Sequence, residues 1–143
     1  MTDGVVAGGA DGSDLSRPVM AWSFGPGDVA TLRRALAAHA RYHGLRGGDH
    51  DDFVLAVHEV VVNVVGHGGG SGWVRLWRAG RSLCCEISDK GPGIPAGYLD
   101  QSRMPGHEGV GGRGLWLITQ LSDGVSFESG EEGTVVRLAK IVE

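Results

Sequence analysis

The stretch that decides the fold is residues 58–67, which read HEVVVNVVGH. Glu59, Asn63 and His67 recur every four residues, and this spacing places side chains on one face of an α-helix. The residues around them are mostly valine, so we expect this helix to be largely buried. A buried carboxylate is costly unless it is paired. A cation that also holds an anionic ligand is a natural partner for Glu59 and Asn63.

The valine run 60–65 would also suit a β-strand, because β-branched residues favour strands. Three features favour a helix instead. The segment 49–67 is too long for an ordinary strand, its opening aspartates suit a helix N-terminus, and the glycines of 66–70 end it. We therefore predict a helix over 49–67.

The rest of the chain alternates between apolar runs and glycine-rich or proline-rich breaks. The patterns predict strands at 19–24, 73–78, 83–88, 125–129 and 134–141, helices at 28–43 and 114–121, a turn at 89–95 and a flexible loop at 96–111. This order predicts an α/β two-layer sandwich, with a mixed, mainly antiparallel sheet and the helices on one face.

Composition limits the remaining possibilities. The 143 residues suffice for one domain with a sizeable core; we expect it over 18–143, after a disordered Gly-, Asp- and Ser-rich tail at 1–17. The net charge of −4 argues against direct nucleic-acid binding. No apolar run reaches the ~18 residues that span a bilayer, and 1–17 lacks a signal-peptide pattern. Adjacent Cys84 and Cys85 fit a reducing cytoplasm, where we expect the protein to act.

Glu59 and Asn63 have side chains suited to magnesium chemistry. Mg²⁺ prefers oxygen ligands and usually keeps waters and phosphate oxygens, so the Asn63 amide suits one position while Glu59 polarises an attacking hydroxyl or water. His67 either lines the phosphate end or is a solvated residue stabilised by the helix dipole. Taken alone, Glu59 and Asn63 also fit a helix with a polar stripe beside a surface groove.

The first glycine motif, DKGPG, occupies residues 89–93. Asp89 follows a buried strand, where its carboxylate can accept a hydrogen bond from an exocyclic amine and so select adenine over guanine. Gly91 and Gly93 permit a sharp turn and close approach of the backbone to a flat base. Taken alone, the motif is also typical of an ordinary turn.

The second glycine motif, GGRGL, occupies residues 111–115. Gly111, Gly112 and Gly114 precede a predicted helix, whose free N–H groups form an anion site, and Arg113 adds positive charge. No Gly-Lys-Ser/Thr follows and no parallel βαβ unit surrounds the motif, so it is neither a P-loop nor a dinucleotide fingerprint. A glycine-rich mobile loop is the alternative.

Together, in this order, the motifs resemble those of the GHKL ATPase superfamily, whose nucleotide pocket is the Bergerat fold. The N-box pattern E-x-x-x-N-x-x-x-H runs from Glu59 to His67, and the G1 pattern D-x-G-x-G is residues 89–93. The G2 box is residues 112–117, and a Gly-Thr pair common near the phosphates matches Gly133-Thr134.

The resemblance implies a role for each matching residue. Glu59 corresponds to the general base, Asn63 to the magnesium ligand and Asp89 to the adenine-selecting acid. Residues 94–111 correspond to the nucleotide lid. The phosphate side would include His67, Gly111 to Leu115, and Thr134. ATP and Mg²⁺ are the implied cofactors.

Within the superfamily, the sequence looks most like the small stand-alone serine/threonine kinases that act as bacterial anti-sigma factors. Such a protein would phosphorylate an antagonist protein, sequester a sigma factor and form a homodimer. We expect no room for the dimerising helical domain of sensor histidine kinases. The alternatives are a non-catalytic ATP-binding regulatory module and a detached ATPase domain serving a separate phosphotransfer protein.

Overall fold

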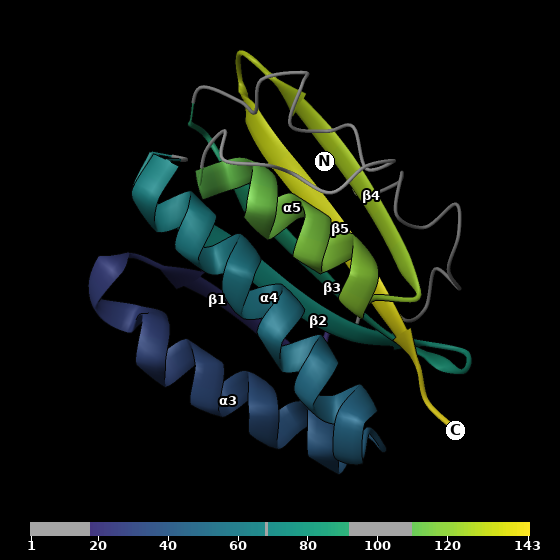
Figure 1. Cartoon of the computed structure of the whole chain (residues 1–143). Helices are drawn as coiled ribbons and strands as arrows, with labels where there is room; N and C mark the ends of the chain where they lie inside the picture. Colours follow the sequence, from purple (N-terminus) through teal and green to yellow (C-terminus); the bar gives the residue numbers. More distant parts are fainter. Residues whose placement is uncertain (1–17, 68, 92–109) are drawn as a thin grey trace.

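The computed structural model describes residues 18–67, 69–91 and 110–143, without the side chains of residues 67 and 110–115. The elements are β1 (Met20–Phe24), the short 3₁₀ helix η1 (Pro26–Asp28), α3 (Val29–Tyr42), α4 (Gly47–His67), β2 (Gly72–Ala79), β3 (Ser82–Asp89), α5 (Val110–Leu121), β4 (Gly124–Gly130) and β5 (Gly133–Ile141). Figure 1 shows the three α-helices of the described part lying side by side over one face of the sheet.

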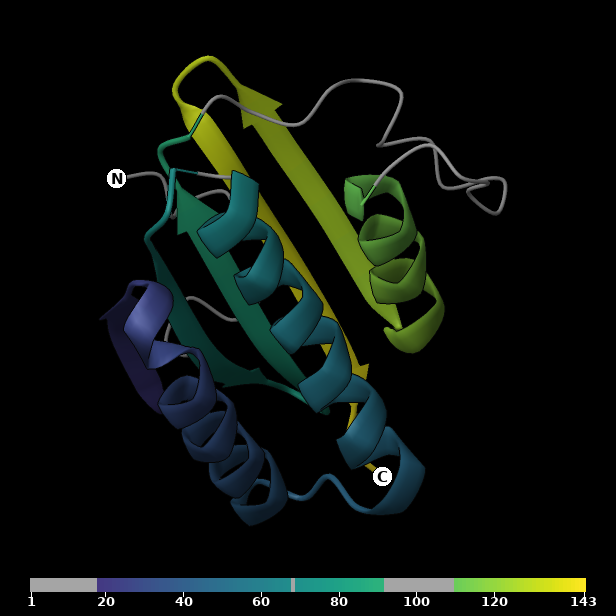
Figure 2. The ribbon, with the colours of Figure 1, turned by 60° about the vertical axis from the view of Figure 1, so that its left-hand side comes forward.

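In the described part of the chain, the sheet has five strands in the order β1-β2-β3-β5-β4. Each pairing within the described strands is antiparallel. The two-layer architecture with helices on one face is therefore confirmed, and the sheet lies at the antiparallel end of the predicted range (Figures 1 and 2).

The two central strands alternate strictly between a face under the helices and an open face. On β3, the buried residues are Leu83, Cys85, Ile87 and Asp89. On β5, they are Thr134, Val136, Leu138 and Lys140. Because successive strand residues point to opposite faces, three polar side chains (Asp89, Thr134 and Lys140) lie on the same face as the hydrophobic core.

Helix α4 is the central helix and packs against both α3 and α5. Its residues Phe53, Val57, Val60 and Val64 are buried in the core. This burial explains why a valine-rich segment is helical, since tertiary packing of one face contributes more than intrinsic propensity. The prediction of a helix through residue 67 is confirmed.

Most element boundaries differ from the prediction by one or two residues, and the start of α5 differs by more. Helix α5 begins at Val110, four residues before the predicted start at 114, so the end of the predicted loop 96–111 is helical. The rest of that loop and the tail 1–17 lie outside the described residues. In the described part, no helix is both long and apolar enough to span a membrane.

Candidate nucleotide-binding site

Glu59 and Asn63 lie one turn apart on α4 and are both half-buried. The side of α4 that faces α3 is marked by Val54, His58 and Val61, which line the crevice between these two helices. At 100° per residue, Glu59 and Asn63 fall on the other side of α4. Because α4 lies between α3 and α5 (Figure 2), these two polar side chains are on the α5 side.

His58 faces α3 rather than the polar side of α4. Burial lowers the pKa of His58, and the neighbouring Arg33 lowers it further, while Glu59 opposes both effects. The ring is therefore held neutral, and its buried Nδ1 has no hydrogen-bond partner in the described part. His58 therefore lies on the α3 side of α4, away from the side that carries Glu59 and Asn63.

Asp89 is the last residue of β3 and is only 8% exposed. Its Oδ1 accepts a hydrogen bond from the Gly91 N–H at 2.6 Å. Burial raises the pKa of the Asp89 carboxyl, and the Gly91 hydrogen bond partly offsets that rise. In the described part, no other hydrogen bond to this carboxylate accompanies the one from Gly91.

Thr134 lies directly opposite Asp89 in the β3–β5 pairing. It is buried, and its hydroxyl is 2.9 Å from the Ser129 hydroxyl. The resemblance suggested a position near the phosphates for Thr134. The strand register places Thr134 beside Asp89, so a ligand group held by one of these two residues is within reach of the other.

The remaining predicted residues are only partly described. His67 is the last residue of α4, and Gly93 lies outside the described residues. Residues 111–115 lie in the first turns of α5, so residues 111–113, which the prediction placed before the helix, are helical. The first turn of a helix carries N–H groups without helical partners, so the backbone of Gly111 and Gly112 can still bind an anion; the side chains of Arg113 and Leu115 are not described.

Lys140 is a buried cation that the sequence analysis missed. Its Nζ donates a hydrogen bond to the Leu121 carbonyl at the end of α5 at 3.0 Å. The same atom is 3.9 Å from Asp49 Oδ1 and 3.8 Å from Asp52 Oδ2 on α4. Lys140 therefore links the start of α4 to the end of α5. The alternation Thr134, Val136, Leu138, Lys140 was the signal that could have placed it in the core.

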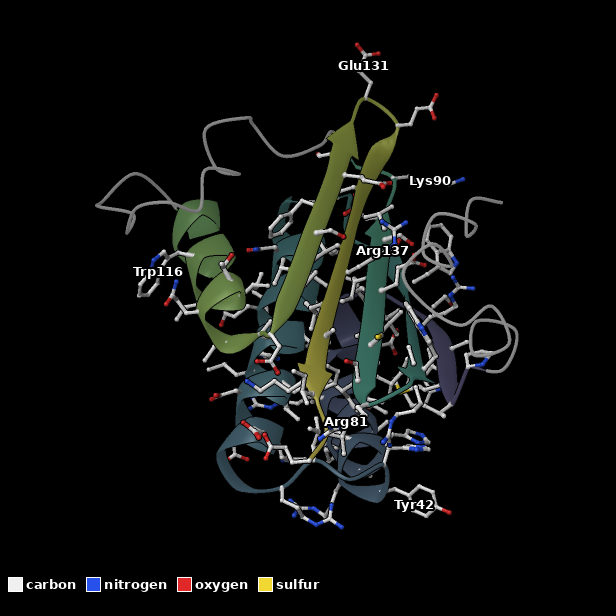
Figure 3. The ribbon with its side chains drawn as sticks, turned by 90° about the vertical axis from the view of Figure 1, so that its right-hand side faces the viewer. Tyr42, Arg81, Lys90, Trp116, Glu131 and Arg137 are labelled. Atoms are coloured by element: carbon white, nitrogen blue, oxygen red, sulfur yellow. The ribbon has the colours of Figure 1, made fainter. Side chains whose placement is uncertain are left out.

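Figure 3 shows which end of the molecule holds the Asp89 turn. Lys90 and Glu131 lie at one end of the sheet, and Tyr42 and Arg81 lie at the other. Gly69 follows α4, and a Cβ added to it would lie only 3.3 Å from the Gly91 Cα. The C-terminal end of α4 and the Asp89 turn therefore meet at the same end of the molecule.

In the part of the chain that the structure describes, no group of three or more His, Cys, Asp or Glu side chains could hold a metal ion. The protein thus offers an amide oxygen from Asn63 beside the Glu59 carboxylate, without a closed ligand cage. Mg²⁺ is typically held by one or two protein groups together with phosphate oxygens and waters. The residues present fit a Mg²⁺ that arrives with a nucleotide.

Residues 23–140 match the family of the histidine kinase-like ATPase domain. This match covers most of the chain, and the protein belongs to that family, whose members carry an ATP-binding domain. No curated protein matches the sequence.

Several solved structures share the fold. The RsbU and RsbW domains of Rv1364c from Mycobacterium tuberculosis align with a TM-score of 0.55 and 18% identity, over 88% of this chain and 34% of that one. The mycobacterial sensor histidine kinase MprB aligns with a TM-score of 0.52 and 17% identity, over 85% and 97% of the two chains. The histidine kinase AdeS of Acinetobacter baumannii aligns with a TM-score of 0.52 and 11% identity, over 87% and 68%.

The chain spans 64% of the length of a histidine kinase domain from Erythrobacter litoralis and 34% of the Rv1364c structure. These likenesses therefore describe the fold.

Proposed function

We propose that this domain, residues 18–143, is an ATP-dependent protein-serine/threonine kinase of the anti-sigma-factor type. The observation that carries the proposal is the pairing of Glu59 and Asn63, one turn apart and half-buried on the α5 side of α4, within a histidine kinase-like ATPase domain. A site that only holds a nucleotide needs magnesium and base contacts. Such a site has less need of a carboxylate, here Glu59, one helical turn from the magnesium-binding amide of Asn63.

The surroundings of each residue decide whether it is assigned to the base or to the phosphates of the nucleotide. Oδ2 of Asp89 accepts a hydrogen bond from the amino group of adenine. Thr134 lies beside Asp89, at the base end of the nucleotide. The backbone of Gly111 and Gly112 at the start of α5 binds phosphate oxygens. Arg113, Gly114 and Leu115 line the phosphate end. His67, the last residue of α4, lies at the Asp89 end instead, where Gly91 and Gly93 shape the turn under the base.

Asn63 holds Mg²⁺, which neutralises charge on the phosphates when it is bound. Glu59 accepts the proton of a serine hydroxyl as the oxygen attacks the γ-phosphorus and ADP departs. Asn63 lies one turn closer to the Asp89 end than Glu59 does. This order along α4 lets one residue act on the metal and the other on the attacking group.

The proposed partners are a sigma factor and a serine-bearing antagonist protein. Support comes from the fold-level likeness to a structure that contains RsbU and RsbW domains. A homodimer is also proposed, because β1 is an edge strand and the exposed Trp22 on β1 and Tyr42 on α3 offer aromatic contact area.

Two rivals predict different fates for the γ-phosphate. A regulatory module that holds ATP would transfer nothing. A detached ATPase domain of a phosphotransfer system would deliver the phosphoryl group to a histidine on a separate protein.

The test is incubation of the purified chain with γ-labelled Mg·ATP, alone and with a candidate antagonist, followed by phosphoamino acid analysis. The proposal expects phosphoserine or phosphothreonine on the antagonist. Acid-labile phosphohistidine on a partner supports the detached ATPase. Tight ATP binding with no labelled protein supports the holding module.

A further inference from the structure

Asp89 lies between two neighbouring strands at positions where side chains are small or absent. Its partner on β2 is Gly72, and its partner on β5 is Thr134, which follows Gly133. The proposed function gives this residue the task of recognising the adenine base, and recognition by a single hydrogen bond requires the carboxylate to be fixed within a fraction of an ångström.

Gly133 touches the main chain of the Asp89 turn. A Cβ added at Gly133 would lie 2.0 Å from the Asp89 carbonyl oxygen and 2.9 Å from the Lys90 Cα. Both neighbours are backbone atoms, which cannot rotate away as a side chain can. The φ angle of +132° disfavours any L side chain as well. A larger residue here would displace the peptide that follows Asp89.

Gly72 makes a second close approach on the other side. A Cβ added there would lie 2.5 Å from the Ser88 carbonyl oxygen and 3.2 Å from Val64 Cγ1. Val64 follows Asn63 on α4. The absence of a side chain at Gly72 therefore sets both the position of the end of β3 and its separation from the magnesium-binding turn of α4.

Gly69 makes the third contact. A Cβ added there would lie 3.3 Å from the Gly91 Cα and 3.4 Å from the Gly91 nitrogen, and the φ angle is +94°. The Gly91 nitrogen is the donor that holds Asp89 Oδ1. The turn after α4 thus rests against the group that orients the carboxylate.

This crowding is local. Gly27, Gly48, Gly66, Gly80 and Gly130, elsewhere in the described chain, have open space where a Cβ would be. Gly44 is crowded only by the side chain of Val142. Among the described glycines, an added Cβ would come within 3 Å of a backbone atom at Gly72 and Gly133. In both cases the backbone atoms belong to residues 88–90.

We propose that Gly69, Gly72 and Gly133 form a backbone clamp that positions the Asp89 carboxylate and thereby sets the preference for adenine over guanine. This inference rests on the proposed function, because it assigns the specificity of the same site. The three glycines are positioning residues: they act on the nucleotide through Asp89. Relief of a 2.0 Å contact to ordinary distance moves the Asp89–Lys90 peptide by about 1 Å, more than a specific hydrogen bond tolerates.

The experiment measures dissociation constants for ATP and GTP by calorimetry, for the wild type and for Gly133→Ala and Gly72→Ala. Gly130→Ala is the matched control, because it lies in the same β4–β5 hairpin with open space around it. We expect each clamp variant to lose about tenfold or more in ATP affinity, equivalent to about 1.4 kcal/mol, with much less change for GTP. The control should keep the wild-type ratio.

A double-mutant cycle separates positioning from general damage to the fold. If the clamp acts through Asp89, Gly133→Ala should add almost nothing to the loss already caused by Asp89→Asn. Fully additive losses, or an unchanged ATP-to-GTP ratio in folded Gly133→Ala and Gly72→Ala, would overturn the inference.

Thermal unfolding of each variant without nucleotide checks that it folds. If Gly133→Ala and Gly72→Ala do not fold, Gly69→Ala decides, because its 3.3 Å contact requires a smaller shift. It should then reduce the ATP-to-GTP ratio measurably, and an unchanged ratio would refute the clamp. A wild-type protein that binds GTP as well as ATP would instead refute the proposed base site itself.

Discussion

Replacing Asp89 with asparagine exchanges one carboxylate oxygen for an NH2 group and keeps the shape of the side chain. Because the Gly91 N–H already occupies Oδ1 at 2.6 Å, the asparagine must leave its carbonyl oxygen there. Its NH2 group then points where Oδ2 was. In the proposed complex this places a donor against the amino group of adenine, which is also a donor.

The size of the effect follows from the lost contact. A hydrogen bond to a charged group contributes about 1.5–3 kcal/mol, which corresponds to a loss of roughly 10–150-fold in affinity. ATP and ADP should weaken by the same factor, because both carry the same base. GTP, whose position 6 is a carbonyl acceptor, should gain relative to ATP.

The same substitution should make the nucleotide-free protein more stable. Burial raises the pKa of Asp89, so the folded state binds the proton more tightly than the unfolded state does. The ionised carboxylate therefore destabilises the fold above that raised pKa, and the penalty disappears below the ordinary aspartate range. The stability gain of Asp89→Asn should be largest at neutral pH and should shrink as the pH is lowered.

Calorimetric titration with ATP, ADP and GTP measures the first effect, and denaturant unfolding at several pH values measures the second. Glu131→Gln, an exposed carboxylate at the same end of the sheet (Figure 3), controls for net charge. Unchanged ATP affinity in Asp89→Asn would refute the assignment of the base site. A stability gain that grows toward acid pH would refute the account of its burial.

Two further substitutions or measurements test the surroundings of the site. Lys140→Met should lower the free energy of unfolding by about 1–3 kcal/mol, because it leaves the Leu121 carbonyl at the end of α5 without its donor. Arg81→Met, an exposed change of equal charge, is the control in denaturant titration, and equal losses would contradict this role. Burial raises the pKa of the Cys85 thiol, and the thiolate is the reactive form. Cys85 should therefore resist alkylation at neutral pH until the protein unfolds. Mass spectrometry of labelled peptides measures this, and an equal alkylation rate for Cys85 in the native and the unfolded protein would contradict it.

The order of elements and the two-layer fold were predictable because hydrophobic periodicity and glycine breaks are local signals. The helix at 47–67 required one further argument, since its valines favour a strand. Length and the acidic start decided the question correctly, and the burial of Val57, Val60 and Val64 supplies the physical reason.

The residues of the candidate site could be predicted only where they belong to a sequence motif. Asp89 was identified from its place at a strand end, but its pairing with Thr134 depends on strand register, which the sequence does not specify. The close approach at Gly72 could not be predicted either, because a glycine at the start of a strand does not reveal that a Cβ there would lie 2.5 Å from a backbone oxygen. Lys140 was overlooked because a lysine in a strand is ordinarily exposed.

The most direct test of the kinase proposal compares Glu59→Ala with Asn63→Ala. Nucleotide binding and transfer of labelled phosphate from ATP to a serine-bearing antagonist are measured for each variant. Glu59→Ala should bind Mg·ATP like the wild type and transfer about 10²–10⁴-fold more slowly, the loss usual for a general base. Asn63→Ala should lose both binding and transfer. Transfer at the wild-type rate by Glu59→Ala, or no labelled antagonist with the wild type, would contradict the proposal that this domain is a kinase.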